Sequence, residues 1–281
     1  MRRPGLRIVD TGRRRIVCGT EPMVMGVINV TPDSFSDGGL WLDPAAAVDR
    51  ALQLAADGAA ILDVGGESSR PGAFPIPTDE ELRRVVPVIR ELARRLDLPV
   101  SVDTRKPSVA DAALDAGAEI VNDISGLRDP AMAALVARSG AAVVTMHMRG
   151  TPETMQQLSP SPDILEDVHG FFESVLHLCV DPVKIILDPG IGFGKTVKDN
   201  LVLLNRLGHF SEFGRPILVG ASRKSFIGKV SGAPVQDRLG GSVAAAVLAA
   251  ERGAAILRCH DVRETVQALR VARAVRDESE G

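Results

Sequence analysis

The chain has 281 residues, of which 45% are hydrophobic and 25% are charged, so it has enough apolar residues for one large or two small soluble domains. Its longest apolar runs, such as residues 242–250, are far shorter than the ~20 residues of a membrane-spanning helix, which argues against a membrane protein. The formal net charge is -3 and the basic residues are scattered, so no nucleic-acid partner is expected.

The first predicted element is a β-hairpin. Residues 6–9 and 15–18 are two short β-prone runs, and the turn-forming residues Asp10, Thr11 and Gly12 lie between them. We expect this hairpin to cap the structure that follows it.

Short apolar runs then alternate with segments of helical periodicity. The runs that predict buried strands are 24–30, 61–64, 100–102, 120–124, 142–146, 185–187, 217–219 and 255–257. The segments that predict amphipathic helices are 44–56, 78–92, 107–116, 130–138, 164–178, 199–207, 235–252 and 262–275. Asp43 is a candidate N-cap ahead of Pro44, and Thr78 with Glu81 is a candidate capping box.

Eight strands alternating with about eight helices predict an α/β fold, a (β/α)8 TIM barrel with an N-terminal β-hairpin. We expect a single domain over residues 1–281, with the hairpin in 1–20, the barrel in 21–277 and a tail in 278–281. An open doubly wound sheet is the alternative, but it would need a glycine-rich dinucleotide turn after the first strand, where the chain has Asn29 to Asp33.

The three cysteines, Cys18, Cys179 and Cys259, are odd in number and show no C-x-x-C spacing. Neither a disulfide framework nor a zinc site is predicted, and each cysteine is expected to be a small buried hydrophobe. The basic start of the chain is not followed by an apolar stretch typical of a secretory signal, so we expect a cytoplasmic protein.

Polar residues follow almost every predicted strand directly, which matters because TIM-barrel active sites lie at the carboxyl ends of the strands. The residues at these exits are Asn29; the segment from Gly65 to Arg70; Asp103 and Arg105; Asn122 and Asp123; His147; Asp188; Ser222, Arg223 and Lys224; and Arg258, His260 and Asp261. A site for a polar and anionic ligand is therefore expected at this end of the barrel.

Asp103 and Asp188 alone could be helix caps or partners of barrel arginines. Beside the Asn122 amide, however, their carboxylates would match the amide-like and amidine-like edge of a planar heterocycle. Lys224 would add a donor or balance their charge.

Arg70, Arg258 and His260 would supply positive charge for phosphate oxygens. Asn29 and Ser34 could merely shape a turn, or they could hold Mg²⁺ bridged to phosphates. A hydrogen-bonded structural role is at least as plausible for His147 as a role in the site.

Seven segments together carry a family resemblance: VMGVINVTPDSFSDGG (24–39), ILDVGGESSRPGA (61–73), SVDT (101–104), IVNDISG (120–126), IILDPGIGFGKT (185–196), ILVGASRKSFIG (217–228) and LRCHD (257–261). The chain resembles the dihydropteroate synthase family, the sulfonamide-inhibited transferases of folate biosynthesis. The resemblance implies condensation of 6-hydroxymethyl-7,8-dihydropterin diphosphate with p-aminobenzoate, releasing diphosphate.

The resemblance also implies roles for individual residues. The pterin would be bound by Asp103, Asn122, Ile124, Met146, Asp188, Phe193, Gly220 and Lys224. The p-aminobenzoate pocket would be formed by Phe35, Ser69, Arg70, Pro71, Ser222 and Lys224. The diphosphate would be bound by Asn29, Arg70, Arg258 and His260, with Mg²⁺ on Asn29. Asp103, Lys224 and Arg258 would be the catalytic residues.

Two rival functions remain at this stage. A corrinoid-dependent methyltetrahydrofolate methyltransferase has a similar pterin-binding barrel but no need for the SSRP segment (68–71) or the SRK segment (222–224). A non-catalytic relative would not need Arg70, Lys224 and Arg258 intact. The family points to a homodimer. Residues 242–250 are apolar nearly all round, so we expect this helix to be buried either in the barrel wall or against another subunit.

Overall fold

The computed structural model describes residues 6–19, 21–31, 44–68, 70, 72–155, 160–178 and 180–279. Its main sheet has eight strands in the order β8-β7-β6-β5-β4-β3-β10-β9, and all the pairs are parallel. A bridge between Leu187 and Ile217 joins the two outer strands and nearly closes the sheet into a barrel. The eight strands are β3 (Met23–Asn29), β4 (Ile61–Gly65), β5 (Val100–Asp103), β6 (Ile120–Asp123), β7 (Ala142–Met146), β8 (Ile185–Asp188), β9 (Leu218–Val219) and β10 (Ile256–Cys259).

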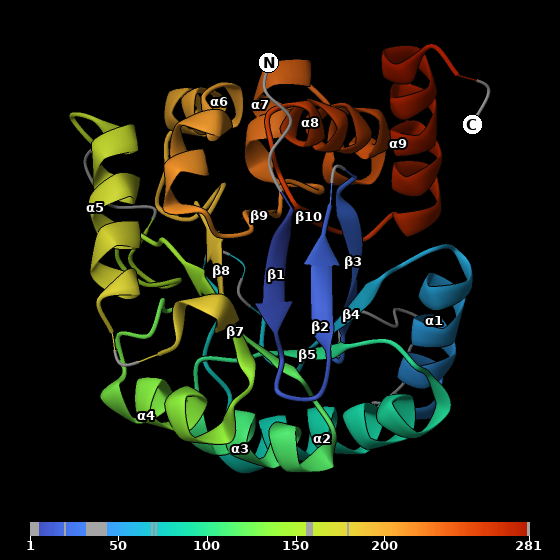
Figure 1. Cartoon of the computed structure of the whole chain (residues 1–281), viewed down its shortest axis with the longest axis vertical. Coiled ribbons are helices and arrows are strands. Elements are labelled where there is room, and N and C mark those ends of the chain that lie inside the picture. The colour runs from blue at the N-terminus through green and yellow to red at the C-terminus, as the bar shows by residue number, and fades with distance from the viewer. Residues whose placement is uncertain are drawn as a thin grey trace.

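Helices surround this barrel, as Figure 1 shows. The α-helices of the described ranges are α1 (Pro44–Ala56), α2 (Thr78–Arg95), α3 (Pro107–Ala116), α4 (Pro130–Ser139), α5 (Ile164–Leu176), α6 (Val197–Asn205), α7 (Ser225–Ser231), α8 (Leu239–Glu251) and α9 (Val262–Asp277). Short 3₁₀ helices are η3 (Pro182–Lys184), η4 (Leu207–Phe213) and η5 (Val235–Asp237). The predicted (β/α)8 barrel is confirmed, and none of the helices in these ranges is both long and apolar enough to span a membrane.

The C-terminal part of the barrel differs from the prediction in one respect. The predicted helix 235–252 is divided into η5 and α8, and α7 precedes them as an extra helix between β9 and β10. Gly228 and the C-capping Gly232, which has a φ of 76°, interrupt the helical periodicity of this segment. The glycines explain why the extra helix was missed.

The predicted hairpin is confirmed as β1 (Arg7–Asp10) and β2 (Arg15–Cys18), which pair antiparallel. It lies across the centre of the ring of helices (Figure 1). Val9 and Ile16 pack in one cluster with strand residues such as Met25. The hairpin therefore closes the end of the barrel where the strands begin.

A salt bridge fixes the hairpin to the barrel. Arg14 at its turn pairs with Glu119, just before β6, at 2.9 Å. Thr11 Oγ1 also donates to Glu119 Oε2 at 2.8 Å. Because Glu119 is buried, these bonds satisfy a carboxylate that would be costly to leave unpaired.

The predicted capping box at Thr78 is wrong. The N-cap of α2 is Pro77, which has no side chain that can accept a hydrogen bond, and Glu81 is turned inward to bind Lys106 at 2.6 Å. A capping box does form at the start of α6, between Thr196 and Asp199. The proposed N-cap Asp43 lies outside the described residues.

Cys18 and Cys259 are buried free thiols, as predicted, and burial raises the pKa of each to about 11. Such thiols are protonated at neutral pH and unreactive, so they act as small apolar groups. Cys179 lies outside the described residues.

Candidate active site

Alternation along the strands places a polar layer above the apolar floor of the barrel. In a strand, residues two apart point to the same side. The lower, mostly apolar positions are Ile61, Ser101, Ile120, Ile186 and Ile256, and the positions two residues further on are Asp63, Asp103, Asn122, Asp188 and Arg258. This polar layer lies at the carboxyl ends of five strands, where barrel enzymes have their active sites.

Arg258 joins two carboxylates of this layer. Its Nε donates to Asp63 Oδ2 at 2.6 Å, and its Nη2 donates to Asp103 Oδ2 at 2.7 Å. Burial alone would lower the pKa of Arg258, but the two carboxylates outweigh burial and raise that pKa, so the guanidinium stays charged. Among the described residues these two bonds use only Nε and Nη2, so Nη1 can still donate to a ligand.

The carboxylates and Asn122 form the bottom of the site, directly above the apolar floor of the barrel. Asn122 Nδ2 donates to Asp63 Oδ2 at 3.0 Å, and Asp63 is 0% exposed. Burial raises the pKa of Asp103, against the opposing charge of Arg258. The arrangement thus presents acceptor oxygens and an amide within one water-poor layer.

Asp188 and Lys224 lie on the opposite side of this layer. Asp188 Oδ1 accepts a hydrogen bond from the Gly190 amide at 2.7 Å, and burial raises the pKa of Asp188 while Lys224 opposes the increase. Burial lowers the pKa of Lys224 to about 8, so this lysine is still mostly protonated at neutral pH. Its Nζ donates to the Ile191 carbonyl and lies 4.4 Å from the centre of the Phe193 ring.

An apolar wall stands beside these groups. It is made of Ile124, Met146, Met148, Met155 and the partly buried Phe193. Gly220 lies between the two cations, because a Cβ built on it would be 3.8 Å from both Lys224 Nζ and Arg258 Cβ. Flexible methionines and an aromatic ring beside hydrogen-bonding groups suit a flat heterocyclic ligand.

Ser222, His260 and the exposed Arg70 lie beside Arg258 at the rim of the site, where Arg223 pairs with Asp261. His260 Nδ1 is 3.1 Å from Ser222 Oγ. Burial and the charges of Arg258 and Arg223 lower the pKa of His260 to about 3, and the exposed Arg70 also contributes. The imidazole is therefore neutral at neutral pH, so it offers a hydrogen bond and not the positive charge expected from the sequence.

Asn29, the predicted metal ligand, ends β3 and is half-buried beside Gly65 of β4. Its amide oxygen is the kind of hard donor that Mg²⁺ accepts, and Mg²⁺ commonly takes its other ligands from water and substrate phosphates. The residue therefore fits the metal. Among the described residues, another possible ligand group, His169, His209 and Glu212, lies on the outer helices α5 and η4.

His147, for which a structural role is the alternative, lies outside the polar layer. His147 faces away from the site: it is buried against Phe171, with ring centres 5.4 Å apart, and burial lowers its pKa to about 2. A structural role is therefore favoured, although within the described part of the chain its Nδ1 has no hydrogen-bond partner. Phe35, Ser69 and Pro71 lie outside the described residues, as does Ser34.

The sequence patterns did not identify several residues at the carboxyl-terminal end of the barrel, which we call the barrel mouth. Asp63 interrupts the apolar run ILDVG, and a carboxylate in the middle of a buried strand is itself a signal. Lys195 was also missed; its Nζ donates to the His147 carbonyl at 3.0 Å, and burial lowers its pKa to about 7. Met148 and Met155 gave no signal, because methionines in an irregular segment have no periodicity to mark them.

Comparisons with known proteins agree on one family. The family model described as pterin binding enzyme matches residues 25–260. The dihydropteroate synthase of Escherichia coli (strain K12) is 46% identical over 259 residues, which cover 91% of this chain and 92% of the relative. A structure of the Yersinia pestis dihydropteroate synthase with a sulfonamide drug has a TM-score of 0.91 at 42% identity, covering 96% of this chain and 99% of that chain.

The Xanthomonas albilineans dihydropteroate synthase has been solved with two relevant ligands. Its complex with 4-aminobenzoic acid has a TM-score of 0.89 at 45% identity and covers 96% of this chain and 98% of that chain. Its complex with 7,8-dihydropteroate has a TM-score of 0.86 at 43% identity, with the same coverage.

Proposed function

Because this chain belongs to the pterin-binding enzyme family and is a dihydropteroate synthase, we propose how the side chains of its barrel mouth divide the reaction among them. The enzyme condenses 6-hydroxymethyl-7,8-dihydropterin diphosphate with p-aminobenzoate to give 7,8-dihydropteroate and diphosphate. One observation supports the division of roles above all: Arg258 is held between Asp63 and Asp103 in the polar layer.

The pterin ring is bound by Asp103, Asn122 and Asp188, with Lys224 as a further donor. Its ring edge carries several N–H donors and acceptors, and buried carboxylates beside an amide can pair with them in one plane. The apolar wall formed by Ile124, Met146 and Phe193, with Gly220 opposite, packs on the ring faces. Asp63 does not need to touch the pterin, since it orients Asn122 and Arg258.

The diphosphate lies toward Arg258, His260 and Asn29. The bond between the pterin methylene carbon and the diphosphate oxygen breaks, and the electron pair leaves with diphosphate. The arylamine nitrogen then bonds to that carbon and loses a proton. Arg258 stabilises the departing charge, and Asp103 stabilises the positive charge that develops at the methylene, so no strong base is required. Heavy-atom isotope effects that showed tight participation of the amine would contradict this dissociative order.

The p-aminobenzoate lies nearer the solvent, against Arg70 and Ser222, with Lys224 between the two substrates. Arg70 is exposed, and its charge contributes to the lowered pKa of His260, which supports the proposal that this arginine also serves the diphosphate. The predicted roles of Phe35, Ser69 and Pro71 in this pocket belong to the same proposal.

Mg²⁺ is the proposed cofactor, with Asn29 as its protein ligand, and the bound ion would neutralise charge on the departing diphosphate. We expect product formation from the two substrates to require Mg²⁺, and Asn29→Ala to raise the Mg²⁺ concentration for half-maximal rate by about tenfold. Chromatography of dihydropteroate against Mg²⁺ concentration measures both effects. Asn205→Ala, on the exposed end of α6, is the control, and an unchanged Mg²⁺ dependence in Asn29→Ala would refute the role of Asn29.

Production of dihydropteroate also separates this function from its rivals. A methyltransferase would form no dihydropteroate, and a non-catalytic relative would release no diphosphate from the pterin substrate. Release of both products in equal amounts is the expected result.

A homodimer is proposed through the surface of α7 to α9. Large apolar side chains are exposed on α7, η5, α8 and α9: Val230, Val235, Leu239, Leu248, Val271 and Val275. Exposed large apolar side chains on neighbouring helices favour an interface with a second copy of the chain. Sedimentation at micromolar concentration should give twice the 29.8 kDa chain mass, and Leu248→Glu should give the monomer. Val17→Glu, at an exposed position of the hairpin, is the control, and a wild-type monomer would contradict the dimer.

A cytoplasmic location completes the proposed function. Cys18 and Cys259 are free thiols, which are typical of a reducing compartment, although both are also buried. Fractionation of cells that express the tagged chain tests this location.

A further inference from the structure

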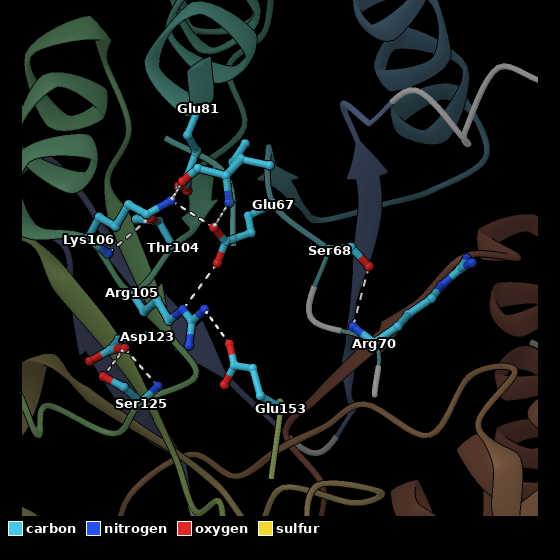
Figure 2. Close-up of polar contacts among 11 residues, drawn as sticks. Glu67, Ser68, Arg70, Glu81, Thr104, Arg105, Lys106, Asp123, Ser125 and Glu153 are labelled. Carbon is cyan, nitrogen blue, oxygen red and sulfur yellow. Dashed lines mark hydrogen bonds and ion pairs between the residues drawn. The ribbon is translucent and has the colours of Figure 1, made fainter. Parts of the chain in front are cut away.

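The segment that carries Arg70 is tied together at its base by Glu67. Glu67 Oε2 accepts a hydrogen bond from the Ile76 amide, nine residues further along the chain, at 3.0 Å. Lys106 Nζ donates to the same Glu67 oxygen at 2.7 Å and to the Ile76 carbonyl at 2.8 Å. Both ends of the connection between β4 and α2 are thus held by one carboxylate and one ammonium group (Figure 2).

Glu67 and Lys106 are also bonded to three further side chains, which are Glu81, Arg105 and, through Arg105, Glu153. Lys106 Nζ also binds Glu81 of α2, which is 1% exposed, at 2.6 Å. Arg105 Nε binds the second oxygen of Glu67, Oε1, at 3.1 Å, and its Nη2 binds Glu153 between β7 and α5, also at 3.1 Å. We call the side chains of Glu67, Glu81, Arg105, Lys106 and Glu153, with the backbone of Ile76, the Glu67 cluster.

Glu67 and Lys106, at the centre of the Glu67 cluster, stabilise each other's charge. Burial alone would raise the pKa of Glu67, but the bonds from Lys106 and the Ile76 amide outweigh burial and lower that pKa. Hydrogen bonds to Glu67 and Glu81 raise the pKa of Lys106 against the effect of burial. Both groups are therefore charged at neutral pH, and charge-assisted hydrogen bonds between them fix the geometry.

Arg70 points away from this cluster. Figure 2 shows its side chain extending to the side opposite Glu67, Lys106 and Arg105. The amide of Arg70 is 3.4 Å from Ser68 Oγ, its carbonyl accepts from the Ala73 amide at 3.1 Å, and the Gly72 amide donates to the Pro152 carbonyl at 3.3 Å. No side-chain partner of the Arg70 guanidinium occurs among the described residues, so its position depends on the backbone that carries it, which is held at Gly72 and at the base formed by Glu67 and Ile76.

We propose that Glu67 is a positioning residue that holds the segment 67–76 so that Arg70 is presented to p-aminobenzoate. The inference rests on the proposed role of Arg70 in binding this substrate. Through Arg105 and Glu153 the same cluster connects the backbone that carries Arg70 to the segment between β7 and α5, which contains Met155, a residue of the apolar wall. The Glu67 cluster thereby fixes the p-aminobenzoate side of the mouth relative to the pterin side.

The test is Glu67→Gln, which keeps the shape of the side chain and removes its charge. We expect the KM for p-aminobenzoate to rise by about tenfold while kcat and the affinity for a pterin without phosphate change less than about twofold, because the chemistry and the polar layer are untouched. Glu91→Gln is the matched control, since Glu91 on α2 also binds two cationic side chains, Arg94 and Arg95, but on the surface. An unchanged KM in Glu67→Gln, or an equal loss of pterin affinity, would overturn the proposal.

The double variant Glu67→Gln/Arg70→Ala shows whether Glu67 acts through Arg70. If it does, Glu67→Gln has no further effect on KM once Arg70 is alanine, whereas independent effects would multiply and overturn the proposal. Hydrogen exchange of the Ile76 amide is the readout that needs no substrate. It should be faster in Glu67→Gln, and unchanged exchange would also count against the Glu67 cluster. A normal KM in Arg70→Ala alone would instead refute the proposed role of Arg70, with the exchange result left standing.

Discussion

Arg258→Ala is expected to lower kcat/KM by about a thousandfold, because it removes the charge that faces the departing diphosphate and frees two buried carboxylates at the same site. Arg258 is the shared partner of Asp63 and Asp103. Steady-state formation of dihydropteroate measures the loss. Arg94→Ala, on the exposed surface of α2, is the control, and a variant that kept more than about a tenth of the wild-type rate would contradict the role of Arg258.

The same substitution should destabilise the fold without abolishing it. Removing one partner of a buried ion pair costs about 3–5 kcal/mol, and urea unfolding measures this difference. In the variant, burial raises the pKa of Asp103 without opposition from Arg258. The wild-type pKa of Asp103 is already raised to about 7 and that of the variant is higher still, so only the variant keeps this carboxyl protonated between the two values. The stability gap to the wild type should therefore narrow as the pH falls through that interval toward about 7 and stay constant below it. A gap that stayed constant with pH would contradict this explanation.

Asp188→Asn should reduce kcat/KM for the pterin substrate by about a hundredfold, since a site built to accept hydrogen bonds from the ring would present an amide donor instead. The fold should survive, because the asparagine oxygen can still accept the bond from the Gly190 amide that Asp188 Oδ1 accepts. Calorimetric titration with a pterin measures the lost affinity.

The control for this substitution is Asp111→Asn, at an exposed aspartate of α3 that pairs with Arg138. Normal pterin affinity in Asp188→Asn, with only the KM for p-aminobenzoate changed, would contradict the assignment of Asp188 to the pterin subsite.

The barrel could be predicted from the sequence because a strand buried on both faces leaves a short apolar run. The same logic found Asp103, Asn122 and Asp188, each at or next to the end of such a run. It missed Asp63, because β4 continues two residues beyond the polar layer to Gly65. The first polar residue after a run marks the polar layer only where the strand ends at that layer.

The long-range partners in the mouth could not be predicted in the same way. Glu67 and Lys106 are 39 residues apart in the chain, and Arg258 is 195 residues from Asp63. No periodicity connects such positions, and only the closure of the barrel brings them together. The misplaced capping box has a similar cause: Glu81 fits the local capping pattern, but the distant Lys106 binds its carboxylate instead.

Within the described part of the chain, the hairpin formed by β1 and β2 covers the end of the barrel where the strands begin, so the polar layer is approached from the opposite end. The pterin substrate, which would lie deepest, is then covered by the p-aminobenzoate that binds nearer the solvent, so the pterin has to enter first. A compound bound at the p-aminobenzoate position would therefore also slow the release of a pterin bound below it.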